Sequence, residues 1–356
     1  MTTRRGFLAG LAAAASFPRP TWADAGSPAY LAAAQVPDGS YRLFGLTAAG
    51  ERLFDLPLPD RGHAAAAHPT RPEAVAFARR PGTFALVIDC ATGTEKARLE
   101  SPEGRHFYGH GAFSSDGHTL FTPENDYEAG QGVIGVWDTR ADYTRIDEFP
   151  SGGVGPHDAR LMPDHETLVV ANGGIDTHPD SGRTKLNIPL MEPNLTYVTL
   201  DGRILEQVEL DRALHKNSIR HLAVSPDGQV AFAMQWQGDV ADNPPLVGLH
   251  RRGEAARLLI APDEAHRRME GYAGSVALSG GVVAITSPRG GLAQRFDAET
   301  GAFLGQHASA DVCGVSAAGT GFALTTGTGL VEGIDADRTA WQARHDCRWD
   351  NHLVAI

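Results

Sequence analysis

The chain has 356 residues, of which 42% are hydrophobic and 21% are charged, and its formal net charge is −12. This acidic balance argues against a nucleic-acid-binding protein, because contact with phosphates requires a basic face. The 41 glycines and 22 prolines suit many short strands joined by tight turns better than long helices. After the amino terminus, no apolar run approaches the roughly 18 residues that are needed to span a bilayer.

The amino terminus has the pattern of an export signal. Arg4 and Arg5 precede a mildly apolar run over residues 8–17. The small residues of Ala23-Asp24-Ala25 then stand at the spacing that a signal peptidase recognises. We interpret residues 1–25 as a twin-arginine signal peptide and residues 26–356 as a single domain. We therefore expect a periplasmic protein whose mature chain has no membrane span.

Short strands separated by turns recur from the start of the mature chain to its end. The first two are expected at Tyr30–Gln35 and Tyr41–Leu46, with a Pro-Asp-Gly-Ser turn between them. Strands of about five residues with glycine-containing turns are typical of a sandwich, a barrel or a propeller. The sequence contains no long amphipathic helical pattern.

Four segments share a short apolar strand and a turn similar to Ser-Pro-Asp-Gly. They read HAAAAHPTR from His63, GHGAFSSDGH from Gly109, HDARLMPDHE from His157 and RHLAVSPDGQ from Arg220. His63, His110 and His157 follow one another at intervals of 47 residues, and the next interval, to His221, is 64 residues because of an insert. A period of about 40–50 residues that holds four short strands is typical of a β-propeller.

Six blades follow from these repeats, and the two ends of the chain supply one more. Weaker copies of the repeat start near Gly274 and Val312. Residues 349–356 have the pattern of an inner strand with no blade after it, and residues 30–50 have the pattern of strands with no inner strand before them. We predict an all-β, seven-bladed propeller closed by amino- and carboxyl-terminal strands in one blade, with six and eight blades as alternatives.

The three cysteines leave two interpretations open. In an oxidising compartment one disulfide is expected, and Cys313 with Cys347 is the favoured pair because they fall in successive repeats. Alternatively, all three cysteines, including Cys90, are small buried apolar residues. No CxxC motif is present, so a thiolate metal site is not indicated.

Histidines gather at the start of the first strand of each repeat, which lines the central channel in a propeller. When the repeats are aligned on the turn after this strand, two adjacent columns of polar residues appear. The candidate metal ligands in these columns are His63, His110, His157, Asp158, His221 and His352. Imidazoles with a carboxylate nearby suit one transition metal such as iron, copper or zinc. The same ring is equally suited to bind an anion or to titrate between about pH 5 and 8.

A structural role for these histidines is the alternative. A Gly-His pair ahead of a Trp-Asp pair marks WD-type repeats, in which the histidine belongs to a buried hydrogen-bond network within its blade. Gly109-His110 and Trp137-Asp138 fit that spacing, although no other repeat has both pairs. Both interpretations remain open at this point.

The insert in the third repeat, at residues 176–187, is expected on one face of the array, where insertions usually form binding loops. Asp176, His178 and Asp180 alternate along it as candidate oxygen and nitrogen ligands. We expect a lid that contacts an anionic or carboxylate-bearing partner at the channel mouth, and a solvated loop is the alternative. The candidates for contact with a bound ligand or cofactor are Asn172, Arg183, Lys185, Arg220 and Trp236.

Several longer phrases resemble a bacterial family of unknown function. They are Pro156-His157-Asp158, VANGGIDTHPDSGRTKLN (170–187), SIRHLA (218–223), QWQG (235–238) and GYAGSVA with TSPRGG (271–291). The family that they resemble consists of twin-arginine-exported propellers commonly encoded beside imelysin-like iron-uptake proteins and a di-haem oxidoreductase. The resemblance covers the mature chain and implies a periplasmic propeller in iron or copper handling, with those proteins as candidate partners. It implies no catalytic residues.

Three functions are compatible with these observations. The first is a monomeric, non-enzymatic binding protein in iron or copper acquisition, which holds a metal or ligand at the histidine-rich channel mouth. The second is a metal-dependent hydrolase or lactonase, with Glu124, Asn125, Asn172 and Asn217 around a divalent cation. The third is a metal-free interaction scaffold. An excess of histidine over carboxylate at the mouth favours the first, and the chain has no GxSxG or HExxH motif.

Overall fold

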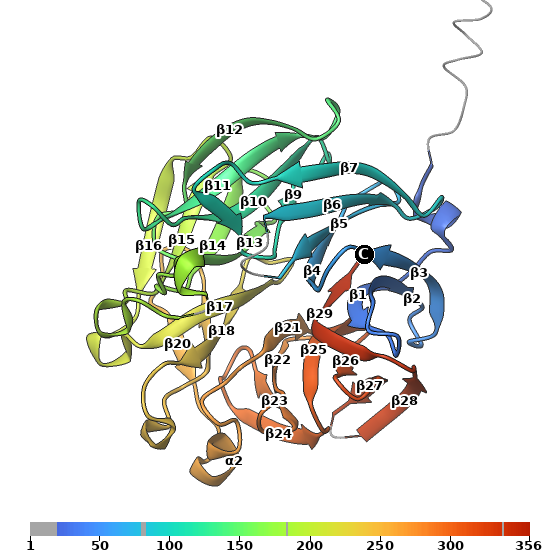
Figure 1. Cartoon of the computed structure of the whole chain (residues 1–356). Coiled ribbons are helices and arrows are strands. Elements are labelled where there is room, and N and C mark those ends of the chain that lie inside the picture. Colours follow the sequence, from blue (N-terminus) through green and yellow to red (C-terminus); the bar gives the residue numbers. More distant parts are fainter. Residues whose placement is uncertain (1–19, 80–82, 183, 337) are drawn as a thin grey trace, which may run out of the picture.

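Seven antiparallel sheets surround a central axis in the computed structural model, which describes residues 20–79, 83–182, 184–336 and 338–356 (Figure 1). The arrangement confirms the predicted propeller and its predicted number of blades. The predicted signal peptide lies outside the described residues as far as residue 19, and Arg183 of the insert also lies outside them.

The first three blades follow one another along the chain. Blade 1 contains β4 (Gly62–Ala67), β5 (Glu73–Ala78), β6 (Phe84–Asp89) and β7 (Thr94–Glu100). Blade 2 contains β8 (Arg105–Phe107), β9 (Ala112–Phe113), β10 (Thr119–Asp126), β11 (Gln131–Asp138) and β12 (Thr144–Pro150). Blade 3 contains β13 (Pro156–Leu161), β14 (Thr167–Asn172), β15 (Asn194–Thr199) and β16 (Ile204–Glu209).

Blades 4 to 6 continue the ring. Blade 4 contains β17 (Asn217–Val224), β18 (Val230–Trp236), β19 (Val247–His250) and β20 (Arg257–Leu259). Blade 5 contains β21 (Ser275–Ser279), β22 (Val282–Ser287), β23 (Leu292–Asp297) and β24 (Phe303–Ala308). Blade 6 contains β25 (Val312–Ala318), β26 (Gly321–Thr326), β27 (Leu330–Asp335) and β28 (Arg338–Arg344).

Blade 7 joins the two ends of the chain. Its strand order is β29 (Arg348–Ala355), β1 (Tyr30–Gln35), β2 (Tyr41–Leu46) and β3 (Arg52–Leu58). Figure 1 shows the red carboxyl-terminal strand beside the blue amino-terminal strands, and Leu31 pairs with Val354 across this junction. The predicted closure is confirmed.

Helical segments are short and lie in the connections. They are α2 (Asp263–Arg267) and the 3-10 helices η1 (Trp22–Ala25), η2 (Pro179–Ser181), η3 (Ile188–Leu190), η4 (Arg212–Leu214) and η5 (Val240–Asp242). Within the described parts of the chain, no helix is long and apolar enough to cross a membrane. Helix η1, at the end of the predicted signal peptide, packs on the propeller, and the Trp22 indole donates a hydrogen bond to the His68 carbonyl at 2.9 Å.

The apolar core is divided among the blade interfaces. The described residues form seven clusters of buried side chains, one between each pair of neighbouring blades. Strand β5 is buried at all six positions because neighbouring blades cover both of its faces, whereas the outer strand β7 is largely exposed. Apolar packing thus holds neighbouring blades together.

The cysteines follow the second of the two predicted interpretations. Cys90, Cys313 and Cys347 are all free and buried, so the disulfide considered between Cys313 and Cys347 is not formed. Cys313 and Cys347 belong to the same apolar cluster between blades 6 and 7. Burial raises the pKa of each of the three thiols to about 12.

Shortening a side chain of the closing strand is expected to destabilise the whole ring. Leu353 of β29 is only 5% exposed within the interface between blades 6 and 7. Leu353→Ala is expected to lower the free energy of unfolding by about 2–5 kcal/mol, as for other buried leucines. Leu304→Ala, at a position that is 42% exposed, is the matched control with little expected effect. Urea denaturation of both variants measures the difference, and equal losses would contradict the inferred closure.

Thiol titration tests the state of the cysteines. Protein purified under oxidising conditions and unfolded without reductant is expected to release three reactive thiols, one from each free cysteine. Before unfolding, labelling is expected to be slow, because burial and the raised pKa values suppress the reactive thiolate. A single thiol after unfolding would show that Cys313 and Cys347 are bonded.

Candidate functional site

The inner strands are irregular where the predicted site residues lie. In blades 1, 3, 4, 6 and 7 the register between the inner strand and its neighbour shifts at this level. Adjacent side chains of a regular strand point to opposite faces, whereas a bulge changes the direction of one of them. In blade 4 the shift lies between Ile219 and His221, and the adjacent Arg220 and His221 both line one cavity of the channel.

The inner strand of blade 2 is divided in two. Strand β8 pairs with β10 and forms the first half of the channel strand, and β9 forms the second half. The break between β8 and β9 brings His110 into the channel. Gly109 has a positive φ of 96°, and a Cβ there would lie 2.5 Å from Cδ2 of His63. Glycine is therefore required for this approach.

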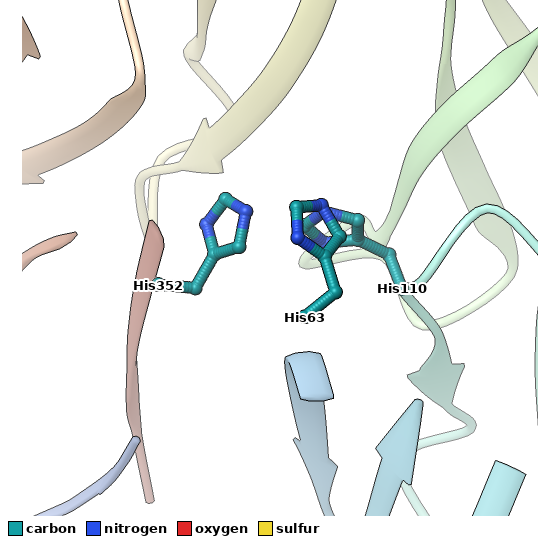
Figure 2. A group of neighbouring side chains, drawn as sticks. All are labelled: His63, His110 and His352. Carbon is teal, nitrogen blue, oxygen red and sulfur yellow. The ribbon is translucent and has the colours of Figure 1, made fainter. Parts of the chain in front are cut away.

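Five imidazoles meet in the channel and form what we call the histidine cluster. Its members are His63, His110, His157, His221 and His352. Among neighbouring rings, the centroids of His63 and His352 lie 4.6 Å apart and those of His63 and His221 lie 6.5 Å apart. Figure 2 shows the rings of His63, His110 and His352 converging from three different segments of the chain. The predicted histidines are thus all brought together.

Most members of the cluster have ring nitrogens that are buried without a hydrogen-bond partner in the described protein. These atoms are both nitrogens of His63, Nε2 of His110, Nδ1 of His221 and Nε2 of His352. A WD-type network does not account for His110, because the hydrogen bonds from Trp137 continue through Thr122 to Glu124 and do not reach His110. The cluster therefore differs from a satisfied structural network.

Asp158 lies beside His110 in the channel. Its Oδ1 lies 3.4 Å from Nδ1 of His110, and its Oδ2 accepts a hydrogen bond from the backbone of Leu222 at 3.0 Å. Arg160 lies 3.3 Å from the same carboxylate. A carboxylate on one ring nitrogen orients a histidine so that the other nitrogen can bind a metal. Asp158, predicted as a ligand, is therefore better placed to orient one.

His157 has the opposite arrangement. Its Nδ1 accepts a hydrogen bond from Arg220 at 3.2 Å. A neutral imidazole that accepts at Nδ1 carries its proton on Nε2, which then has no lone pair for a metal. His157 in this state is a poorer ligand than His110.

Two groups of three histidines have ligand atoms that all lie within 4.8 Å of one another. One contains His63, His110 and His352, and the other contains His110, His157 and His221. All members of the first group are buried, and each has an unpartnered ring nitrogen. The first group is therefore the better candidate for a metal site, and His110 belongs to both.

The cluster is electrically neutral at physiological pH. Burial lowers the pKa of His63, His110, His157 and His221 well below the usual value of 6.5, and neighbouring imidazoles and arginines add to the effect. The pKa of His352 falls to about 3 for the same reason. Neutral imidazole is the form that coordinates transition metals.

The candidates for ligand or cofactor contact divide into two sets. Lys185, Arg220 and Trp236 line a cavity beside the cluster, and Lys185 of the insert also donates a hydrogen bond to Gln237. Asn172 lies elsewhere: it is fully buried and bonds to Ser151, Asn194 and Thr196 within blade 3.

His178 of the insert does not join the cluster. His178 lies 3.5 Å from Glu128 and packs against Tyr127. The set considered for a hydrolase does not converge either, because Glu124 binds Arg145 and Thr122, and the Asn217 amide donates to the Pro245 carbonyl.

Comparison with known proteins places the chain in a family. The family profile described as "Protein of unknown function (DUF1513)" matches residues 56–356. The chain belongs to this family. No curated protein matches the sequence. Among solved structures, hydrazine synthase from Kuenenia stuttgartiensis is similar, with a TM-score of 0.60 and 15% identity over 89% of this chain and 96% of that chain. At this identity the likeness shows the fold alone.

Several residues around the cluster were not found from the sequence. Arg79, Tyr108, Tyr272 and Arg289 line the same cavity as Lys185 and Arg220. They lie in connections or at strand ends, where the repeats do not align. The sequence signal that was available is the pair of adjacent polar columns, since both can line a channel only if the inner strands contain bulges.

Acidification is expected to destabilise the metal-free protein because of the buried histidines. Each has a lower pKa in the folded than in the unfolded chain, so the unfolded state binds more protons below about pH 6.5. Stability is therefore present above that pH and is lost as pH falls, by up to about 1.4 kcal/mol per pH unit for each histidine.

Urea denaturation at several pH values between about 7 and 5 measures how steeply the free energy of unfolding falls with pH. In the variant His221→Gln with His352→Gln this pH dependence is expected to be smaller by the contribution of about two protons. The exposed pair His118→Gln with His165→Gln is the control with an unchanged slope. An equal slope in the cluster variant would show that these histidines are not held neutral.

Proposed function

We propose that this propeller is a periplasmic metal-binding protein that holds one transition-metal ion, iron, copper or zinc, in the histidine cluster. The observation that carries the proposal is the set of buried, unpartnered ring nitrogens on His63, His110 and His352. A buried polar atom without a partner costs about 1–3 kcal/mol. A bound ion removes this cost by accepting the lone pairs.

The donor chemistry selects the class of metal. Neutral imidazoles suit copper, zinc and iron, whereas calcium and magnesium prefer carboxylate and carbonyl oxygens. The thiols lie outside both groups of three, so soft thiolate chemistry is not part of the proposal. Three protein ligands leave a coordination position open for a further ligand.

A binding role is favoured over hydrolysis. The carboxylate and amides that a calcium-type hydrolase site would use, such as Glu124 and Asn172, are held by hydrogen bonds inside separate blades. The resemblance of the sequence to exported propellers encoded beside imelysin-like and di-haem proteins supports a role in iron or copper acquisition. We propose that the mature chain, residues 26–356, acts there as a monomer and passes metal to or from such a partner.

Metal content tests the proposal. The mature protein, purified from the periplasm without a histidine tag, is expected to contain or take up about one equivalent of copper, zinc or iron. His110→Ala is expected to abolish uptake, because His110 belongs to both groups. His63→Ala with His352→Ala is expected to do the same, whereas His157→Ala with His221→Ala is expected to retain binding. Asp158→Asn is expected to weaken binding by about 10- to 100-fold through the loss of orientation.

The matched control is His118→Ala with His165→Ala, which removes two exposed histidines. Elemental analysis and competition with a chromogenic chelator measure stoichiometry and affinity, and far-ultraviolet circular dichroism checks the fold of each variant. Unchanged metal content in His110→Ala would place the metal outside the histidine cluster, and a wild-type protein that takes up no metal would leave the propeller as a metal-free scaffold.

A further inference from the structure

A basic cavity lies beside the histidine cluster on the side of the insert. Its volume is about 320 Å³, and His157 and His221 form part of its wall. Four cationic side chains line it, and no described lining residue is a carboxylate. The four are Arg79, Lys185, Arg220 and Arg289.

These cations converge from four separate segments. Arg79 follows β5 in blade 1, Lys185 belongs to the insert, Arg220 lies on β17 in blade 4 and Arg289 lies in the turn after β22 in blade 5. Like charges that share a small cavity repel one another, and the walls of a cavity strengthen their field. An anion in the cavity would turn this repulsion into attraction.

Each of these side chains also makes contacts around the cavity. Arg220 donates to neutral His157, and the Arg289 guanidinium lies 4.5 Å from the ring centre of Tyr272. Lys185 donates to the neutral amide of Gln237. Arg79 lies 3.6 Å from Asp350, which also binds Arg61 more closely, at 2.6 Å. The charge of Asp350 therefore balances that of Arg79 in part.

We propose that this cavity binds a small polycarboxylate. Guanidinium groups match the planar fork of a carboxylate, and several cations from different directions suit a molecule with several carboxylates. The volume is at the lower end of the range of about 300–1,000 Å³ for small-molecule sites. Trp236 and Tyr272 supply flat walls for the carbon skeleton.

Two kinds of polycarboxylate ligand can be distinguished. A free polycarboxylate would be held by the cations alone. A metal chelate of a polycarboxylate would be held by the cations and also through its metal by the histidine cluster, and this second source rests on the proposed function.

Calorimetric titration with citrate and with tricarballylate separates them. Tricarballylate has the three carboxylates of citrate but lacks the hydroxyl group that makes citrate a strong chelator. Both are titrated into the mature protein, metal-free and loaded with zinc. If the cavity binds a free polycarboxylate, both citrate and tricarballylate are expected to bind the metal-free protein. If it binds a metal chelate, citrate but not tricarballylate is expected to bind, and only to the zinc-loaded protein.

The charge variant Lys185→Gln with Arg289→Gln is expected to weaken either kind of binding by about tenfold or more. Both residues are exposed on loops, so the fold is expected to survive, and a thermal melt checks it. Arg52→Gln with Arg203→Gln removes the same charge at exposed positions outside the cavity and is expected to bind as the wild type does.

Two outcomes would overturn the inference. One is the absence of binding heat for both anions with both forms of the protein, and the other is equal affinity in the cavity and control variants. Failure of the proposed metal function has a different signature: zinc uptake is absent, while metal-free protein still binds tricarballylate and loses this binding in the charge variant.

Discussion

Pairing between β29 and β1 closes the ring, and the same pairing builds the site. The register of this pair shifts between its contacts at Leu353 and Trp349, so the bulge contains the stretch from Asp350 to His352. Asp350 binds Arg61 at 2.6 Å, and His352 enters the histidine cluster. A ligand that engages His352 therefore also stabilises closure, because anything that binds only the folded chain favours folding.

The central channel is lined by polar side chains because the apolar side chains are buried between neighbouring blades. The middle strands of each blade bury both faces against neighbouring blades, and seven separate apolar clusters result. The inner strands must approach one another at the axis, and small residues make this possible. At Gly314 a Cβ would lie 2.8 Å from the backbone nitrogen of Leu353 on the closing strand. The remaining space holds the imidazoles, whose burial without partners opposes folding and is offset by the interfaces around them.

Much of the fold was predictable because its signals are periodic. Each turn of the Ser-Pro-Asp-Gly type ends an inner strand, so the spacing of these turns gives the blades and places His63, His110 and His157 at one level of the channel. The rest of the site was not predictable by the same means. Arg289 and Arg79 lie where the repeats do not align, and Asn172 adjoins the insert in sequence but turns into its own blade. The predicted disulfide between Cys313 and Cys347 was wrong. Their positions in neighbouring repeats determine only roughly how far apart the two cysteines lie, whereas a disulfide requires a specific geometry.

The neutral cluster and the cationic cavity meet at Arg220. This residue lines the cavity and donates to Nδ1 of His157 at 3.2 Å. While that hydrogen bond exists, the proton of neutral His157 stays on Nε2 and this ring does not offer Nε2 to a metal. If the cavity binds an anion as proposed, an anion that attracted the Arg220 guanidinium would weaken this bond, and the proton of His157 would then be free to move to Nδ1. Arg220 would in that case connect the cavity to the channel through the tautomer of a single histidine.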